Sequence, residues 1–233
     1  MTEVCNIVIL TGAGISAESG LATFRAEDGL WEGHRVEKVA TPEGFAADPG
    51  LVHAFYDARR AKLGEVVPNA AHVALARLDA AWAGELLIVT QNVDDLHERA
   101  GARRLVHMHG ELLRGWCVAC DGRFGWVGAM GEGAECPSCS AAGSVRPDIV
   151  WFGELPYEME QIEAALRSCD LFVSVGTSGA VYPAAGYVQT AKYFAAHTVD
   201  INLGPSLGSV IFDEVRIGKA GVEVPKLVGE LLG

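Results

Sequence analysis

Short apolar runs alternate along the chain with longer segments in which apolar residues recur at helical spacing. Helical patterns occupy residues 42–63, 69–82, 157–167 and 182–197, and apolar runs occupy residues 6–10, 85–90, 105–107, 171–175 and 198–203. Residues typical of loops, such as Gly, Asn, Asp and Ser, follow the runs. Strands that are apolar throughout and alternate with helices are typical of a parallel sheet covered on both faces. The pattern therefore predicts an α/β fold with a Rossmann-like parallel sheet flanked by helices.

Two stretches depart from this alternation. Residues 21–41 are polar and aperiodic, which predicts a long loop over a ligand. Residues 112–146 hold two cysteine pairs and many glycines, which predicts an inserted module. We expect one catalytic domain over residues 1–233. Its parts are a large Rossmann-like lobe (1–30, 85–111 and 147–233), the helical part of a small lobe (31–84) and the inserted cysteine module (112–146).

The composition is that of an ordinary globular chain with an acidic excess. Half of the 233 residues are apolar, and the formal net charge is −12. Without a Lys/Arg stripe, direct nucleic-acid binding is not expected, whereas basic protein segments are compatible partners. The first residues lack a basic n-region and a cleavage site, and no apolar run reaches the roughly 18 residues that a membrane span needs. We expect a cytoplasmic protein without membrane contact, acting as a monomer.

The first apolar run leads into a glycine loop. Gly12-x-Gly14-x-x-Ala17 has the spacing of a dinucleotide-binding turn, where small residues let the backbone approach a pyrophosphate. Tight strand-to-helix turns also use glycine for steric reasons, so the loop alone leaves both interpretations open. Glu32 stands about 20 residues further on, where a dehydrogenase has its ribose-binding acid, but no strand is predicted around it. The loop thus indicates a nucleotide-binding site, and the missing second strand argues against an ordinary hydride-transfer enzyme.

Four of the six cysteines form two tight pairs. Cys117-x-x-Cys120 and Cys136-x-x-Cys139, separated by 15 residues, have the spacing of a tetrahedral four-cysteine zinc site. With all ligands supplied by the protein, such a zinc is structural. Buried cysteines that pair by coincidence and a redox CxxC are the alternatives. Cys5 and Cys169 stand alone and are expected to be small core residues.

Polar residues follow two of the apolar runs. Thr90-Gln91-Asn92-Val93-Asp94 places amides and a carboxylate where a doubly wound sheet binds its ligand, although Asn or Asp there also caps helices. His107-Met108-His109-Gly110 places a histidine near another strand end, where it can act as a base. A hydrogen-bonded structural histidine is the alternative.

Taken in order, the motifs resemble those of the sirtuin family, over residues 6 to about 225. They are Gly12-Ala13-Gly14-Ile15-Ser16-Ala17-Glu18-Ser19-Gly20 with Phe24-Arg25, Thr90-Gln91-Asn92-Val93-Asp94, His109-Gly110, the two cysteine pairs, Val150-Trp151-Phe152-Gly153-Glu154 and Gly176-Thr177-Ser178. The resemblance implies an NAD-consuming protein-lysine deacylase with one structural zinc, acting on acylated-lysine segments of proteins. Its products are nicotinamide, free lysine and O-acyl-ADP-ribose.

The resemblance also implies residue roles. His109 is the general base, and Asn92 joins it as a catalytic residue. Residues 150–153 pair with the substrate backbone as an added strand. The implied NAD-binding residues are Gly12, Ala13, Gly14, Ile15, Ser16, Phe24, Arg25, Trp31, Gln91, Asn92, Asp94, Gly176, Thr177, Ser178, Asn202, Leu203, Gly204 and Ala220. The implied substrate-binding residues are Ala40, Tyr56, Arg59, Val150, Trp151, Phe152 and Gly153, and the zinc ligands are Cys117, Cys120, Cys136 and Cys139.

One departure from the common pattern bears on the acyl group. Many family deacetylases read Pro-Asp-Phe-Arg where this chain has Ala22-Thr23-Phe24-Arg25, which resembles the desuccinylase and demalonylase subgroup and bacterial sirtuins. Tyr56 and Arg59, spaced i and i+3 on one helical face, resemble the pair that grips a distal carboxylate there. Ala40 resembles the small residue that leaves room for a longer acyl chain. Outside this family, the same spacing is more typical of an exposed helix face.

The implied activity is removal of succinyl and malonyl groups, and also of acetyl groups. A non-catalytic NAD-sensing or peptide-binding module is one alternative, and mono-ADP-ribosyl transfer from the same cofactor is another. Both His109 and Asn92 are present, which favours a working catalytic site.

Overall fold

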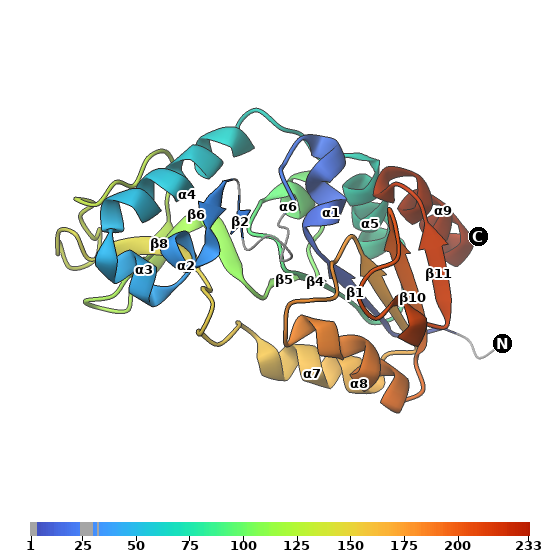
Figure 1. The fold of residues 1–233 in the computed structure, drawn as a ribbon. Coiled ribbons are helices and arrows are strands. Elements are labelled where there is room, and N and C mark those ends of the chain that lie inside the picture. The colour runs from blue at the N-terminus through green and yellow to red at the C-terminus, as the bar shows by residue number, and fades with distance from the viewer. Residues whose placement is uncertain (1–3, 24–29, 32) are drawn as a thin grey trace.

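The large lobe is built on a six-stranded parallel sheet with the strand order β11-β10-β9-β1-β4-β5 (Figure 1). The computed structural model describes residues 4–23, 30–31 and 33–233. Neighbouring strands of this sheet run parallel throughout. The strands are β1 (Ile7–Thr11), β4 (Leu86–Thr90), β5 (Leu105–His107), β9 (Leu171–Val175), β10 (His197–Asn202) and β11 (Glu214–Ile217).

Helices cover both faces of this sheet, which is why its central strands β1, β4 and β9 are largely apolar. On one face α5 (Ala70–Ala81) and α9 (Ala220–Leu232) pack on side chains such as Ile7 and Ile9. On the other face α7 (Met159–Ser168) and α8 (Tyr187–Tyr193) pack on side chains such as Val8 and Leu10. Alternate residues of β1 thus enter different cores, as the two-residue period of a strand requires. The predicted fold class is confirmed.

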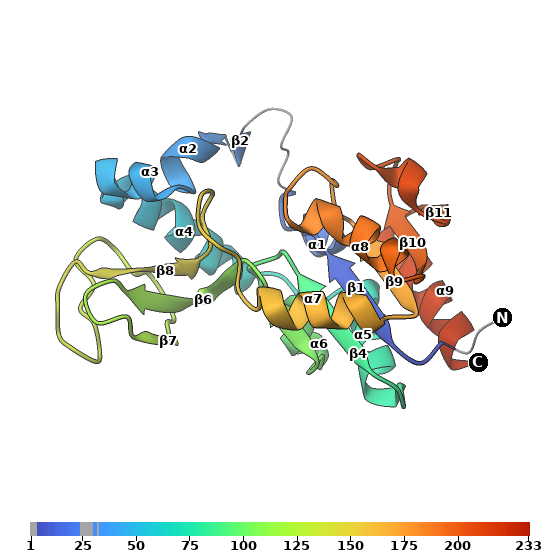
Figure 2. The same ribbon diagram turned by 90° about the horizontal axis from the view of Figure 1, so that it is seen from below.

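The small lobe lies beside the carboxyl ends of the parallel strands (Figure 2). A three-stranded antiparallel sheet of order β7-β6-β8 and the helix α4 form its body. Tyr56, Val52 and Trp151 lie at the centre of its apolar core. Its elements are β2 (Leu30–Trp31), β3 (His34–Arg35), α2 (Val36–Val39), α3 (Pro42–Ala47), α4 (Pro49–Leu63), β6 (Gly110–Cys117), β7 (Arg123–Gly125) and β8 (Val145–Ile149).

Shorter elements complete the chain: α1 (Ala13–Ser16), η1 (Ala17–Ser19), α6 (Leu96–Ala100), η3 (Ala184–Gly186) and η4 (Ser209–Ile211). None of the helices in the described part of the chain is both long enough and apolar enough to span a bilayer.

Several element boundaries differ from the predicted ones. The predicted helix over residues 42–63 is two helices, because the Asp48 side chain accepts a hydrogen bond from the Leu51 N–H and Pro49 begins α4. The predicted helix over 182–197 begins as the short η3, and only 187–193 are α-helical. The stretch predicted as a long loop over 21–41 contains β2, β3 and α2.

The lobe division also differs from the predicted one in one element. Helix α5 was assigned with 31–84 to the small lobe, yet Ala71, Leu75 and Leu78 pack with β1 in the large lobe. The prediction for the single cysteines is confirmed for Cys169, which is 4% exposed. It is wrong for Cys5, which is exposed just ahead of β1.

Candidate functional site

A cavity of about 1670 Å³, here called the cleft, is lined from both lobes. The large lobe contributes the segments that follow β1, β4, β9 and β10, which meet at the carboxyl edge of the sheet. The small lobe contributes one side of α4, Ala40 and residues 150–153. A crevice at this edge is the usual ligand site of a doubly wound sheet.

Most of the predicted site residues line the cleft. They are Gly12, Ala13, Gly14, Ser16, Trp31, Ala40, Tyr56, Arg59, Gln91, Asn92, Asp94, His109, Val150, Trp151, Phe152, Gly153, Gly176, Thr177, Ser178, Asn202, Leu203 and Gly204. Ile15 and Ala220 are not among the lining residues: Ile15 is fully buried in the core, and Ala220 is 8% exposed at the start of α9. Phe24 and Arg25, like Glu32, lie outside the described residues.

Close backbone packing explains the glycines of the loop after β1. The Gly14 N–H donates a hydrogen bond to the Gly176 carbonyl at 2.9 Å. A Cβ atom on Gly14 would stand 2.7 Å from the Gly176 Cα, and Gly176 itself has a positive φ of 63°. The steric interpretation of this loop is therefore confirmed, and the nucleotide interpretation stays compatible with it, because the same packing brings bare backbone to the surface of the cleft.

Three polar side chains on the cleft wall form a chain of hydrogen bonds. The Ser16 hydroxyl donates to the Asp94 carboxylate at 3.0 Å, and the Asn92 side-chain amide donates to the Ser16 hydroxyl at 3.2 Å. Burial raises the pKa of Asp94. The Leu96 N–H also donates to Asp94, at 3.2 Å, whereas the N-cap residue of α6 is Asp95, whose side chain makes no capping hydrogen bond. The network fixes the orientation of Asn92 at the cleft wall.

Two buried histidines support this network from below. His72 Nε2 lies 3.4 Å from the Ser16 hydroxyl, and His97 Nε2 lies 3.0 Å from the Thr11 hydroxyl. Their rings meet edge to face at 5.0 Å. Burial lowers the pKa of His72 to about 4 and that of His97 to about 3, because an imidazolium loses its hydration there. Both side chains are neutral at pH 7.

His107 and His109, near the end of β5, contact adjacent backbone carbonyls but face different surroundings. His109 Nδ1 lies 3.2 Å from the Gln91 carbonyl oxygen, and the ring lines the cleft. A carbonyl only accepts, so Nδ1 carries the proton and Nε2 keeps a lone pair. Burial lowers the pKa of His109, which keeps it neutral at pH 7. His107 Nδ1 binds the Asn92 carbonyl instead, while its Nε2 contacts Glu98 outside the cleft lining.

On the small-lobe side of the cleft, the Arg59 guanidinium lies against two aromatic rings. The Arg59 guanidinium carbon lies 4.3 Å from the Trp31 ring centroid and 3.7 Å from that of Phe55. Tyr56 is fully buried, and its hydroxyl oxygen accepts a hydrogen bond from the Trp151 indole N–H at 2.9 Å. Burial raises the pKa of Tyr56. Arg59, Tyr56 and the small Ala40 all line the cleft from the small lobe.

Residues 150–153, which the sequence predicts to pair with the substrate and which are here called the substrate segment, are held largely by their own backbone donors. The Val150 N–H donates to the His109 carbonyl, the Phe152 N–H donates to the Ala40 carbonyl, and the Trp151 N–H donates to the Glu154 carboxylate. Arg146 forms two hydrogen bonds to Glu154, at 2.6 and 2.9 Å. The Trp151 side chain is 2% exposed and belongs mainly to the small-lobe core.

The four paired cysteines converge at the far end of the small lobe. The Sγ atoms of Cys117 and Cys139 are 3.8 Å apart, and those of Cys120 and Cys136 are 3.7 Å apart. A tetrahedral zinc with Zn–S bonds of about 2.3 Å places its sulfurs about 3.8 Å apart. All four sulfurs lie within 4.8 Å of one another. The four thiols therefore suit one structural zinc.

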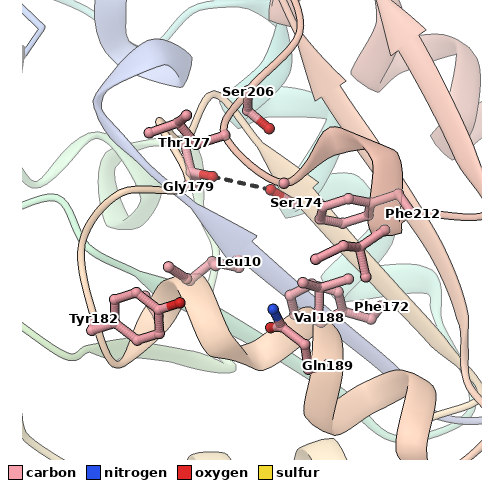
Figure 3. A pocket seen from close by; sticks show the side chains of 15 residues that line it. Leu10, Phe172, Ser174, Thr177, Gly179, Tyr182, Val188, Gln189, Ser206 and Phe212 are labelled. Atoms are coloured by element: carbon pink, nitrogen blue, oxygen red, sulfur yellow. Dashed lines mark hydrogen bonds between the residues drawn. The ribbon is translucent and has the colours of Figure 1, made fainter.

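A smaller cavity of about 210 Å³ lies behind the loop that follows β9 (Figure 3). Ser174 and Thr177 contact each other at its wall through their hydroxyl oxygens at 3.2 Å, and Phe172 and Val188 give it an apolar floor. Thr177 lines this cavity and the cleft. The loop that faces the cleft is thus backed by a partly open space.

Sequence reasoning missed some residues of the cleft. Lys62 lies one turn after Arg59, and Leu155 and Tyr182 stand 87% and 74% exposed on its lining. Lys62 could have been found, because i and i+3 positions share a helix face. Leu155 and Tyr182 lie in irregular segments, where side-chain direction has no sequence period.

Comparisons with known proteins agree with this geometry. The Sir2 family model matches residues 12–183. An NAD-dependent protein deacylase of Pasteurella multocida (strain Pm70) is 56% identical over 234 residues, covering all of both chains. One of Vibrio vulnificus (strain YJ016) is 57% identical over 97% of this chain and 94% of its own.

Among solved structures, a Sir2 homolog in complex with NAD is similar with a TM-score of 0.90 and 37% identity, covering 98% of this chain and 90% of that one. A Sir2 protein bound to an acetylated peptide is similar with a TM-score of 0.84 and 26% identity, covering 98% and 94%.

Proposed function

The chain belongs to the Sir2 family and is an NAD-dependent protein deacylase, and on this premise we propose that it prefers acyl groups that end in a carboxylate. Succinyl- and malonyl-lysine are the favoured substrates, and acetyl-lysine is a weaker one. The products are nicotinamide, free lysine and O-acyl-ADP-ribose. The observation that carries the proposal is the buried guanidinium of Arg59 on the cleft wall, beside Tyr56 and Ala40.

NAD is held by the large-lobe wall of the cleft. The glycine loop takes the diphosphate side, Gln91, Asn92 and Asp94 take the nicotinamide ribose side, and Gly176 and Asn202 take the adenosine side. The fixed network behind Asn92 and the bare backbone at Gly14 support these assignments. When bound, NAD supplies an activated ribose carbon from which nicotinamide departs.

His109 is the general base of the reaction. Its Nδ1–H is occupied by the Gln91 carbonyl, so the lone pair on Nε2 is the one available for a ribose hydroxyl proton. The lowered pKa keeps that lone pair unprotonated at pH 7. The backbone bond also holds the ring in one tautomer, which a base needs to act repeatedly.

Arg59 reads the distal carboxylate. A carboxylate inside a narrow cleft loses hydration and needs a charged partner, and a guanidinium offers two parallel donors. Arg59 is 8% exposed and is framed by Trp31 and Phe55, so its plane is held by aromatic rings on the cleft wall. A preorganised fork of this kind loses little side-chain entropy when it binds.

Tyr56 adds a neutral donor beside that charge. Its oxygen already accepts the Trp151 indole N–H, which leaves the hydroxyl proton for an acceptor. No acceptor for this proton is found within the part of the chain that the structure describes. A carboxylate oxygen of the acyl group supplies one.

The substrate segment takes the peptide as an added strand. Because the N–H groups of Val150, Trp151 and Phe152 have partners within the protein, recognition relies on the Gly153 N–H and on carbonyl oxygens. Gly153 has a φ of 93°, a conformation that a larger residue rarely adopts.

The proposed enzyme acts as a cytoplasmic monomer and does not bind nucleic acid. Its net charge of −12 supports the absence of nucleic-acid binding.

The test is a comparison of kcat/KM for matched acetyl- and succinyl-lysine peptides with NAD. Removing the guanidinium in Arg59→Met costs roughly 2–5 kcal/mol for the succinyl substrate, the range for breaking a buried charge pair, and leaves acetyl turnover nearly unchanged. Tyr56→Phe has the same direction and a smaller size. Lys62→Met is the matched control, since its cation is half-exposed on the same helix side and contributes at most about 1 kcal/mol.

An equal loss for both peptides in Arg59→Met assigns that arginine to structure or NAD binding and rejects the acyl preference. A wild-type protein that acts on acetyl-lysine alone also rejects it, while leaving the deacylase activity in place. Accumulation of ADP-ribosylated protein in place of free lysine indicates transfer to protein as the main reaction.

A further inference from the structure

A second group of metal-binding side chains lies outside the cleft and away from the cysteines. Glu98 on α6, His107 at the end of β5 and Glu111 on β6 come from three elements, and their ligand atoms lie within 4.8 Å of one another. The His107 side chain is 9% exposed, and those of Glu98 and Glu111 are 40% and 37% exposed. The group is open to ions on one side and backed by protein on the other.

The hydrogen bond on the far side of the His107 ring decides which nitrogen faces the carboxylates. Nδ1 lies 3.0 Å from the Asn92 carbonyl oxygen, which can only accept, so Nδ1 carries the proton. Nε2 then points at Glu98 Oε1, 2.7 Å away. Histidines that bind metals through Nε2 commonly donate the other N–H to a backbone carbonyl, which fixes the ring in this way.

A simple ion pair accounts for only part of this arrangement. A proton on Nε2 satisfies Glu98, but Glu111 remains as a second carboxylate within 4.8 Å of this pair. The Arg114 guanidinium reaches Glu111 at only 3.6 Å and is shared with Asp148 at 3.7 Å. Two ligands on one metal at about 2.1 Å lie no more than about 4.2 Å apart, so a small rotation of the exposed glutamates completes the set.

We propose that Glu98, His107 and Glu111 bind one divalent first-row transition metal ion, distinct from the structural zinc. One imidazole and two carboxylates suit Zn²⁺, Co²⁺ or Mn²⁺ better than the all-oxygen set that Mg²⁺ prefers. Three protein ligands leave positions for water, so this site exchanges its metal, unlike the four-thiolate site. The His107 ring contacts the Asn92 carbonyl through Nδ1, so a metal ion bound at this site also restrains residues 91–94 at the cleft wall.

The experiment titrates Co²⁺ into zinc-loaded protein, with binding followed by calorimetry and by visible absorption. Zinc in the cysteine site keeps the thiolates from binding the probe, and the absorption of Co²⁺ bound to nitrogen and oxygen ligands is weak compared with that of thiolate complexes. Wild type binds one equivalent beyond its zinc. Glu98→Gln and Glu111→Gln each raise the dissociation constant at least about tenfold, whereas Glu160→Gln, a matched change on exposed α7, does not.

A second readout separates this site from other surface histidines. Amide hydrogen exchange over residues 91–94 slows when Co²⁺ binds to wild type and stays unchanged in Glu111→Gln, whose melting temperature matches wild type because Glu111 is partly exposed. Absence of an extra equivalent in wild type overturns the proposal. Binding that is equally tight in both glutamate variants overturns it as well.

Discussion

The two lobes of this protein are held together in different ways. The large lobe is a parallel sheet buried between two layers of helices, and its cores consist mainly of aliphatic side chains. The small lobe draws its elements from separate stretches of the chain around one aromatic-rich core, and a cysteine cluster stands apart from that core. The contrast suggests that the large lobe gives the catalytic groups a rigid base, while the small lobe depends on polar and metal cross-links.

Arginines supply many of those cross-links. Arg60 donates to the Leu112 carbonyl at 2.9 Å and pairs with Asp57, which in turn accepts the Met130 and Gly131 N–H groups. This joins α4 to the cysteine module. Arg146 stacks on Trp151 at 3.3 Å from the ring centroid and pairs with Glu154, which fixes the substrate segment. The neighbouring Arg59 and Arg60 therefore differ in role: one lies on the cleft wall and the other ties the lobe together.

Removal of the zinc is expected to have the largest effect on the difference in stability between the two lobes. Metal binding supplies roughly 10–16 kcal/mol in small four-ligand zinc modules, and little apolar burial replaces it around Cys117 and Cys136. Chelation therefore abolishes deacylation and opens the small lobe, while β1, β4 and β9 keep slow amide exchange. Metal analysis and lobe-resolved hydrogen exchange measure this. Retained activity without metal contradicts it.

Breaking the Arg60 link comes next in size. Arg60→Met leaves Asp57 partly buried without its cation and lowers the free energy of unfolding by about 3–5 kcal/mol. Chemical denaturation measures the change. The matched Lys62→Met, which removes an exposed pair with Glu65, costs less than about 1 kcal/mol. Equal losses in the two variants make Arg60 an ordinary surface arginine.

Replacing the proposed base, His109, sharpens the difference between the lobes in catalysis. His109→Ala lowers kcat by about 10²-fold or more for every acyl group, because the large lobe serves the step common to all substrates. Arg59→Met, on the small lobe, alters only the acidic acyl groups. Steady-state rates on acetyl- and succinyl-peptides, with zinc content and melting temperature as controls, distinguish the two. Near-normal turnover in His109→Ala rejects its assignment.

A smaller effect concerns acid and the large lobe. Folding lowers the pKa of His72 to about 4 and of His97 to about 3 from an ordinary 6.5. Below pH 6.5 the unfolded chain takes up protons that the folded chain refuses, so stability falls as the pH is lowered towards those values. At pH 5.5 each of the two histidines lowers the free energy of unfolding by about 1.4 kcal/mol relative to neutral pH. Denaturation at several pH values measures the slope, and His97→Gln reduces it without changing its sign. An unchanged slope contradicts the buried, neutral state.

The sequence was informative where a residue's neighbours along the chain fix its surroundings. The strands β4, β5 and β9 were predicted within a residue because each is a short, largely apolar run bounded by polar residues. The cysteine spacing predicted the sulfur cluster because each pair lies within one tight turn.

Features that depend on distant packing were not predictable in this way. The edge strand β11 alternates half-buried and exposed residues and carries Glu214 and Arg216, so no apolar run marks it. Helix α9 contains Pro225, which ordinarily argues against a helix interior. Helix α5 was placed in the wrong lobe because its amphipathic pattern shows that it packs, but not against which layer. The break at Asp48-Pro49 had a local signal in its Asp-Pro pair.

Strands β6 and β8 pair side by side where the chain enters and leaves the cysteine module. Gly110 pairs with Ile149 and Cys117 pairs with Val145, so the chain leaves and re-enters the lobe at one place. Extra residues between Trp126 and Ala134 lengthen a loop whose ends are already joined, at about 0.6 kcal/mol for each doubling of its length. Evolution can therefore add a recognition element for one protein target there, while the sheet that binds NAD keeps its shape.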